Sequence, residues 1–206
     1  MAVTINGNGV VTGLDSEGSS DLGTELEAAG GLVMVTPTTI ANSGGTATLT
    51  AGAVAFSGVT SLSLNGVFTT TYDNYRIMWD ATCSTNNNVN ARMRVGGVDE
   101  TGSNYVNQYL LASATTVAAN RATTTSFPFG DLTTTIRAAA QIEIFSPRIA
   151  QPTNFLVTGQ YSSASAALIF YAGTHSLSTA YDGFTISPNT GTWTGTLRVY
   201  GYRNGI

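Results

Sequence analysis

Short runs in which apolar and polar residues alternate follow one another from Phe56 to the end of the chain. In the segment 74–82, for example, Tyr75, Ile77 and Trp79 occupy every second position. A period of two places apolar side chains on one face of a β-strand and polar side chains on the other. The pattern predicts strands over residues 61–68, 74–82, 89–95, 105–111, 141–145, 153–161, 166–171, 184–187 and 194–202.

Polar links rich in turn-forming residues separate these strands, notably 84–88, 96–104 and 119–135. Many short strands joined by such links are typical of an antiparallel β-sandwich, and a jelly roll is the favoured form. The segment 166–171 is apolar on both faces, which favours a central or interface strand. The sequence therefore predicts an all-β protein.

Residues 1–55 differ from the rest of the chain. They contain no aromatic residue, and five of the 12 acidic residues fall between Asp15 and Glu27. The segment is predicted to be mostly extended, with one helix over 21–29 that is too short to be stable alone. We therefore expect an N-terminal attachment and trimerisation region at 1–55, ordered by partner chains, and a β-sandwich head domain at 56–206.

Composition excludes several classes of protein. The chain has 33 Thr, 23 Gly and no Lys, and its formal net charge is −4. Nucleic-acid binding is not expected, because it needs a high density of basic residues. No apolar segment is long enough to cross a bilayer, so membrane insertion is not expected either. A single cysteine, Cys83, cannot form an internal disulfide.

Groups suited to catalysis are few. His175 is the only histidine, no G-x-S-x-G motif is present, and we expect a loop or turn histidine rather than a catalytic one. Cys83 is expected to be a small apolar residue at a strand end. Asp80 and Glu143 lie in predicted strands and could face each other as glycosidase carboxylates do, but a structural or solvent-facing role is favoured. One His and one Cys cannot assemble a zinc site. The sequence predicts no enzyme, no cofactor and no metal.

Two polar links carry groups suited to binding. One contains Asn86, Asn87 and Asn88, and the other contains Asp99 and Glu100. Amides and carboxylates can bind sugar hydroxyls, and a rigid sandwich can hold such loops in place. We interpret these five residues as a candidate receptor-binding site for carbohydrate; the alternative is that the loops are only soluble connectors. Asp99 and Glu100 could also bind calcium, but their spacing matches no known calcium loop.

Several segments resemble tail-fibre, or receptor-binding, proteins of tailed bacteriophages, especially phages of aquatic bacteria and cyanobacteria. The similar segments are 31–37, 56–59, 64–77, 92–99, 184–188 and 195–203, together with 5–9 and 12–14 near the N-terminus. Together they cover most of the chain in patches.

The resemblance implies a homotrimeric structural protein of the virion, made in the host cytoplasm and carried in the phage tail. Its N-terminal part would attach to the tail, the baseplate or an adaptor protein, and its head would bind host surface polysaccharide. A short fibre is expected, because the chain has no repeat shaft and no coiled-coil heptads. The alternative is a capsid cement or decoration protein with the same sandwich. A depolymerase tailspike is less favoured, because no β-helix repeats are evident.

Overall fold

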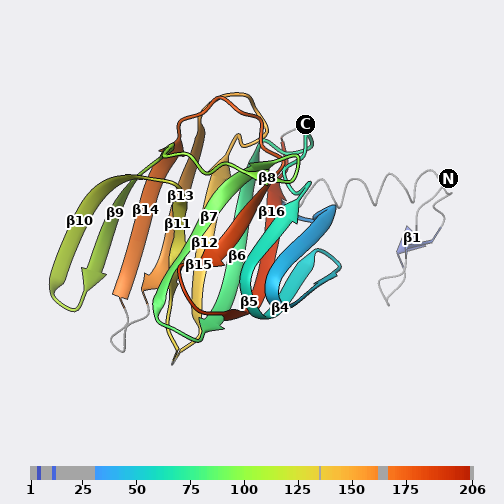
Figure 1. Cartoon of the computed structure of the whole chain (residues 1–206). Coiled ribbons are helices and arrows are strands. Elements are labelled where there is room, and N and C mark those ends of the chain that lie inside the picture. The colour runs from blue at the N-terminus through green and yellow to red at the C-terminus, as the bar shows by residue number, and fades with distance from the viewer. Residues whose placement is uncertain (1–3, 6–10, 13–30, 135, 162–166, 205–206) are drawn as a thin grey trace.

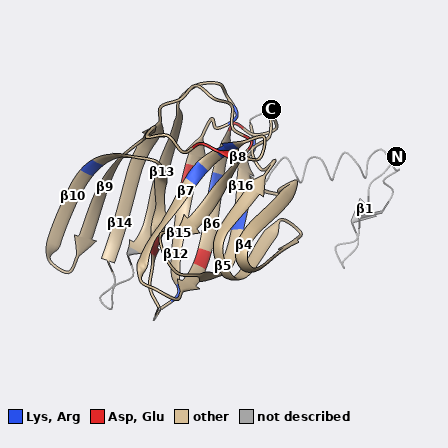
Figure 2. Ribbon diagram, viewed as in Figure 1, with Lys and Arg blue, Asp and Glu red and all other residues tan. Residues whose placement is uncertain are grey.

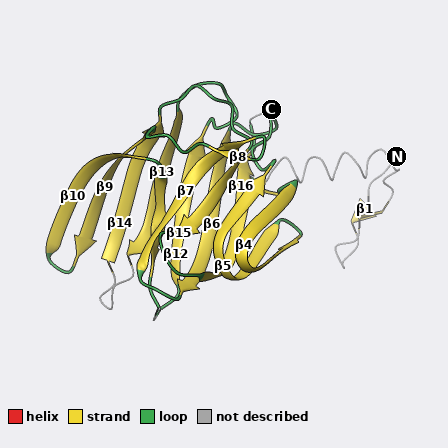
Figure 3. Ribbon diagram, viewed as in Figure 1, coloured by secondary structure: helices red, strands yellow, loops and turns green. Residues whose placement is uncertain are grey.

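The computed structural model describes residues 4–5, 11–12, 31–134, 136–161 and 167–204. All regular structure in these residues is β-strand (Figure 3), which confirms the predicted all-β class. Within the described residues no helix is long and apolar enough to cross a membrane. The helix expected over 21–29 lies outside the described residues.

The strands β1 and β2 form a separate two-stranded sheet, and the other fourteen form one antiparallel sheet. In chain order, the strands are β1 (Thr4–Ile5), β2 (Val11–Thr12), β3 (Leu32–Val35), β4 (Thr39–Thr50), β5 (Ala53–Asn65), β6 (Asn74–Cys83), β7 (Asn87–Val95), β8 (Val98–Asp99), β9 (Tyr105–Ser113), β10 (Thr116–Thr124), β11 (Phe127–Leu132), β12 (Ala138–Phe145), β13 (Thr153–Tyr161), β14 (Ala167–His175), β15 (Gly183–Pro188) and β16 (Trp193–Tyr202).

The fourteen-stranded sheet folds over on itself to give two packed layers (Figure 1). We call the layer β10-β9-β14-β13-β12-β6-β16 the large sheet and the layer β15-β7-β11 the small sheet. Strand β5 belongs to both, because residues 54–59 pair with β16 whereas residues 62–64 pair with β15. The predicted antiparallel β-sandwich is therefore confirmed.

The apolar core lies between the two sheets. Phe127 of the small sheet packs on Phe155 of the large sheet with ring centroids 4.6 Å apart. The indole Nε1 of Trp79 donates to the carbonyl oxygen of Phe129 at 2.9 Å, so the sheets are also joined by a buried hydrogen bond. Both kinds of contact fix the spacing of the two layers. The largest fully buried side chains include Trp193, Tyr75, Tyr105, Tyr181, Phe68, Phe184, Leu62 and Leu64.

Each of the nine predicted strands overlaps a strand of the structure. The segment apolar on both faces becomes β14, which lies between β13 and β9 as a central strand. After β4, three strands were not predicted: β8, β10 and β11. Strand β8 lies in the segment 96–104, where a polar link was expected. Strand β11 lies in the expected link 119–135, and β10 extends into that link from residue 116.

The expected boundary between residues 55 and 56 falls inside β5. Strand β4 pairs with β5 along its whole length, and β3 pairs with β16. Val35 is buried, and Ile40 and Leu49 pack against the core. Residues 31–55 are therefore part of the sandwich itself, because main-chain hydrogen bonds and apolar contacts tie them to the head.

Candidate functional site

Asn87 holds the turn between β6 and β7 in place. Its Nδ2 donates to the carbonyl oxygens of Thr85 at 2.6 Å and Thr190 at 2.9 Å. Its Oδ1 accepts a hydrogen bond from the backbone N–H of Asn189 at 3.0 Å. The side chain is thus engaged on both its donor and acceptor groups, and it connects this turn to the segment between β15 and β16.

The two neighbouring asparagines, Asn86 in the turn and Asn88 on β7, differ in how they are engaged. Asn86 Oδ1 accepts from the backbone N–H of Thr134 at 2.8 Å, which ties the turn to the end of β11. Asn88 is exposed, and its side chain forms no hydrogen bond with the described residues. Of the three predicted asparagines, Asn88 is the one whose amide points to solvent and is available to a ligand.

Asp99 and Glu100 lie at the opposite end of β7. Asp99 Oδ1 forms an ion pair with Arg94 Nη1 at 2.6 Å, and Glu100 Oε1 accepts from the backbone N–H of Gly102 at 2.7 Å. Arg94 lies six positions beyond Asn88 along β7, which corresponds to about 20 Å. The structure therefore does not bring the two predicted groups together into one site.

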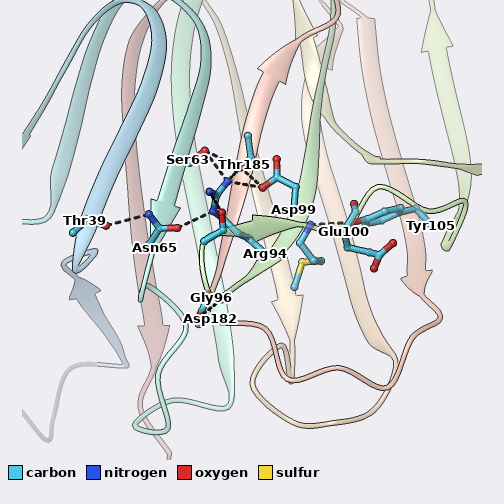
Figure 4. A network of polar contacts seen from close by, with 12 residues as sticks. Thr39, Ser63, Asn65, Arg94, Gly96, Asp99, Glu100, Tyr105, Asp182 and Thr185 are labelled. Carbon is cyan, nitrogen blue, oxygen red and sulfur yellow. Dashed lines mark hydrogen bonds and ion pairs between the residues drawn. The ribbon is translucent and has the colours of Figure 1, made fainter.

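Arg94 is the centre of a polar network on the outer face of the small sheet (Figure 4). Its Nη1 donates to Thr185 Oγ1 at 2.7 Å and Ser63 Oγ at 3.1 Å, and its Nε donates to Asn65 Oδ1 at 2.8 Å. The network joins β5, β15, β7 and β8, and only 15% of the Arg94 side chain is exposed. Because these groups already satisfy one another, we assign the network and its member Asp99 a role in holding the sheet together.

A hollow of about 220 Å³ lies on the same outer face, further along β7 towards Asn88. We call it the small-sheet hollow. Its walls carry amides, hydroxyls and one guanidinium. The lining residues are Asn90, Ala91, Arg92, Ser126, Thr185, Ser187, Pro188 and Asn189. Asn88, Asn90 and Arg92 alternate along β7 and so share this face.

A larger hollow, of about 620 Å³, lies on the outer face of the large sheet. We call it the large-sheet hollow. Arg198, Met78, Gln141 and Thr158 lie side by side across β16, β6, β12 and β13. The next row contains Thr196, Asp80 and Ala139. Short side chains at Ala139, Thr158 and Thr196 leave space between the longer ones, which accounts for the hollow.

Asp80 forms an ion pair with Arg137 at the edge of this hollow, and its other oxygen accepts from the Thr196 hydroxyl. Burial acts to raise the pKa of the Asp80 carboxyl, but the hydrogen bonds from Arg137 and Thr196 outweigh it and hold the pKa below its usual value. Both carboxylate oxygens are therefore occupied, and Asp80 stays ionised.

Asp80 and Glu143 share the outer face of the large sheet but do not form a carboxylate pair. Glu143 is opposite Arg76 and forms an ion pair with it at 2.6 Å. Asp80 lies four residues from Arg76 along β6, so the two acids are separated by about 14 Å. Glycosidase pairs lie closer, at about 5–10 Å. Each acid is instead held by its own arginine, as the sequence had favoured.

His175 is not in a loop, contrary to the expectation. It is the last residue of β14 and is only 1% exposed. Its Nδ1 accepts from the backbone N–H of Leu177 at 3.3 Å, and its Nε2 lies 3.3 Å from the Tyr181 hydroxyl. Burial lowers the pKa of the imidazole, which favours the neutral form. The alternating pattern predicts a strand only over 166–171, whereas β14 continues to His175, which therefore lies in the sheet.

Cys83 lies at the end of β6 and is buried, as expected. Burial raises the pKa of its thiol. Among the described residues, no three His, Cys, Asp or Glu side chains are grouped so that they could hold a metal ion.

Asp131 is a buried carboxyl that the sequence did not single out. It lies on β11 opposite Asn88 and is 4% exposed. Its Oδ2 has no hydrogen-bond partner among the described residues. Burial raises the pKa of Asp131 to about 6. This carboxyl therefore changes charge near pH 6, where most carboxylates stay ionised.

No family model and no curated protein matches the chain. Among solved structures it is similar to a Trypanosoma rangeli sialidase in complex with 2,3-difluorosialic acid, with 12% identity and a TM-score of 0.32 over 85% of this chain and 31% of that one. It is also similar to sucrose-6-phosphate hydrolase from Lactobacillus gasseri, with 10% identity and a TM-score of 0.30 over 77% and 33%.

A third similarity, to an endo-acting O-glycanase of human gut microbiota, has 9% identity and a TM-score of 0.24 over 84% of this chain and 85% of that one. The chain thus spans about a third of the length of the first two proteins. At these TM-scores, none of the three similarities bears on what this chain does.

Proposed function

We propose that the chain is a short tail fibre of a tailed bacteriophage, whose β-sandwich head binds host surface carbohydrate without cleaving it. The sequence resemblance supports the virion assignment. The observation that carries the binding role is the small-sheet hollow, where amides, hydroxyls and Arg92 converge on a rigid face. Hydrogen-bonding groups of this kind match the hydroxyls of a sugar.

Binding without chemistry is supported by the state of the acids and the histidine. Asp80 and Glu143 are about 14 Å apart along the sheet and each is paired with an arginine. His175 is enclosed in the core beneath the surface. Neither arrangement places an acid and a base on opposite sides of a bound glycosidic bond.

The proposed assembly is a homotrimer that attaches to the tail, the baseplate or an adaptor through its N-terminal region. Three heads on one fibre would raise the avidity of weak single-site binding by about a hundredfold or more. The five predicted site residues then divide by role. Asn88 would contact the glycan at the edge of the small-sheet hollow, Asn86 and Asn87 would hold the turn, and Asp99 and Glu100 would order the other end of β7.

Filling the small-sheet hollow tests this site. Ser187 lines the hollow, and its side chain forms no hydrogen bond with the described residues, so Ser187→Gln should occupy the space without breaking a side-chain contact. The matched control is Ser176→Gln, at an exposed position outside the hollow. We expect the Ser187 variant to bind host cells at least tenfold more weakly, and the control to bind as the wild type does. Equal binding by both variants would remove the hollow from the site.

The tail location is tested separately with antibodies against the head, viewed on virions by electron microscopy. Labelling at the tail supports a fibre, whereas labelling spread over the capsid would favour the decoration protein.

A further inference from the structure

The large-sheet hollow lies on the opposite layer from the proposed glycan site and is not used by it. Its volume of about 620 Å³ is within the usual range for small-ligand pockets, about 300–1,000 Å³. The register of four adjacent strands sets its side chains, so the hollow is formed by rigid elements rather than by loops. Rigid placement of binding groups lowers the entropic cost of binding.

The charges in this hollow do not cancel. Arg137 and Arg198 are positive, and Asp80 is the one acid among the residues that line it. The Asp80 carboxylate is already occupied by Arg137 and Thr196. A local excess of one positive charge thus lies on a chain whose formal net charge is −4.

Arg198 is the group that carries this excess. It is exposed, and its guanidinium forms no hydrogen bond or ion pair within the described part of the chain. It lies close enough to Asp80 to lower the pKa of that carboxyl, which places its charge at the hollow. A planar guanidinium with unused donors binds a carboxylate through two parallel hydrogen bonds.

The other walls suit the body of a sugar. Gln141 and Thr158 supply an amide and a hydroxyl in the same row as Arg198, and Met78, 45% exposed, offers an apolar surface between Arg198 and Gln141. Sugar rings present hydroxyls at their rim and C–H groups on their faces, so mixed polar and apolar walls match them better than purely polar ones.

We propose that the large-sheet hollow binds a carboxylate-bearing sugar of the uronic-acid class, with Arg198 binding its carboxylate and Gln141 and Thr158 binding its hydroxyls. This assignment rests on the proposed function in one respect, because it gives the head a second carbohydrate site. It differs from the first site in requiring a negative charge on the ligand.

Calorimetric titration of the full chain with a galacturonic acid trisaccharide and with its carboxyl-reduced neutral counterpart tests the proposal. The acidic trisaccharide should bind, and raising the salt concentration from 50 to 500 mM should weaken it, because exposed charge pairs are screened. Arg198→Gln should reduce its affinity at least about tenfold, which is the usual effect of losing a charge-assisted pair. Arg121→Gln, which removes the same charge from an exposed site on β10, should leave the affinity unchanged.

Several outcomes would overturn the proposal. These are equal affinity for the acidic and neutral trisaccharides, no binding of the acidic one, no effect of Arg198→Gln, or an equal effect of Arg121→Gln. Binding of a glutamate-rich peptide with the same dependence on Arg198, and of no sugar, would instead assign the hollow to a protein partner.

The Ser187→Gln variant distinguishes failure of this proposal from failure of the proposed function. If it loses host-cell binding while the trisaccharide fails to bind the wild type, the proposed function stands and only the acidic-sugar site fails.

Discussion

The backbone N–H of Asn189 donates to the side-chain oxygen of Asn87 at 3.0 Å, and this bond ties the β6–β7 turn to the segment after β15. It shows that neighbouring asparagines in one polar run can have different roles. Asn87 is engaged by the protein, whereas the adjacent Asn88 is exposed with an amide that no described residue binds.

We expect Asn87→Ala to lower the free energy of unfolding by about 1–2 kcal/mol, because it removes three hydrogen bonds at a partly exposed site. Asn88→Ala should leave the free energy of unfolding within about 0.5 kcal/mol of the wild type and weaken host-cell binding. Urea denaturation and a cell-binding assay on both variants measure these effects. The opposite assignment, with Asn88→Ala destabilising and Asn87→Ala silent, would show that the two roles are reversed.

Truncation tests where the head begins. Removing residues 1–30 should leave the melting temperature of the sandwich unchanged, since every strand from β3 onward is retained. Removing residues 1–55 deletes β3, β4 and the first three residues of β5, among them Val54 of the core. It also exposes the edge of the remaining part of β5 and uncovers Phe56. That variant should unfold at a much lower temperature or aggregate. A stable monomeric sandwich after removal of residues 1–55 would contradict the assignment of β4 to the head.

Gly130 lies where β11 passes close to Trp79, at a φ of +130°. A Cβ at this position would lie 2.5 Å from Trp79 Cζ2, so Gly130→Ala should cost about 3 kcal/mol through steric overlap and backbone strain. Gly96 provides the control, because its φ of +58° is also positive but no atom lies within 4 Å of an added Cβ. Gly96→Ala should cost only about 1 kcal/mol. If urea denaturation shows similar losses of unfolding free energy for the two variants, the contact between β11 and Trp79 is not tight.

Asp131 predicts how stability depends on pH. Its pKa is about 6 in the folded protein against an ordinary value of 3.8, so the folded state holds the proton more tightly than the unfolded state. The contribution of this carboxyl to the free energy of unfolding is therefore most favourable below pH 3.8 and is lost as the pH rises through 6. Asp131→Asn should stabilise the protein at pH 8 by up to about 3 kcal/mol and have little effect at pH 4. An equal effect of the substitution at both pH values would show that the pKa of the Asp131 carboxyl is not shifted.

The alternation of side chains was sufficient to predict most of the sandwich, but not the strands β10 and β11. Strand β10 is exposed along most of its length, so it has no apolar face for a pattern to reveal, and its pairing with β9 holds it in the sheet. Strand β11 is buried at every position, and Pro128 and Gly130 interrupt its period at a β-bulge. In both cases the strand is specified by its pairing partners elsewhere in the chain, which a local pattern does not contain.

A local sequence pattern is also insufficient to predict the two proposed binding surfaces. Polar composition drew attention to Asn88, which the structure places at an exposed position. The large-sheet hollow, by contrast, combines residues of four strands whose register no local pattern fixes. Asp80 and Arg198, for instance, come together only because β6 pairs with β16. The proposed roles of these surfaces therefore depend on the pairing of the strands.

The most direct test of the central claim, that this head binds host carbohydrate without cleaving it, is to incubate the purified chain with isolated host surface polysaccharide. The amount bound and the size of the polysaccharide are then measured in the same sample. The account predicts saturable binding that Ser187→Gln weakens at least tenfold and Ser176→Gln does not, with the polysaccharide recovered at its original length. Absence of binding, or shortening of the polysaccharide by the wild type, would contradict it.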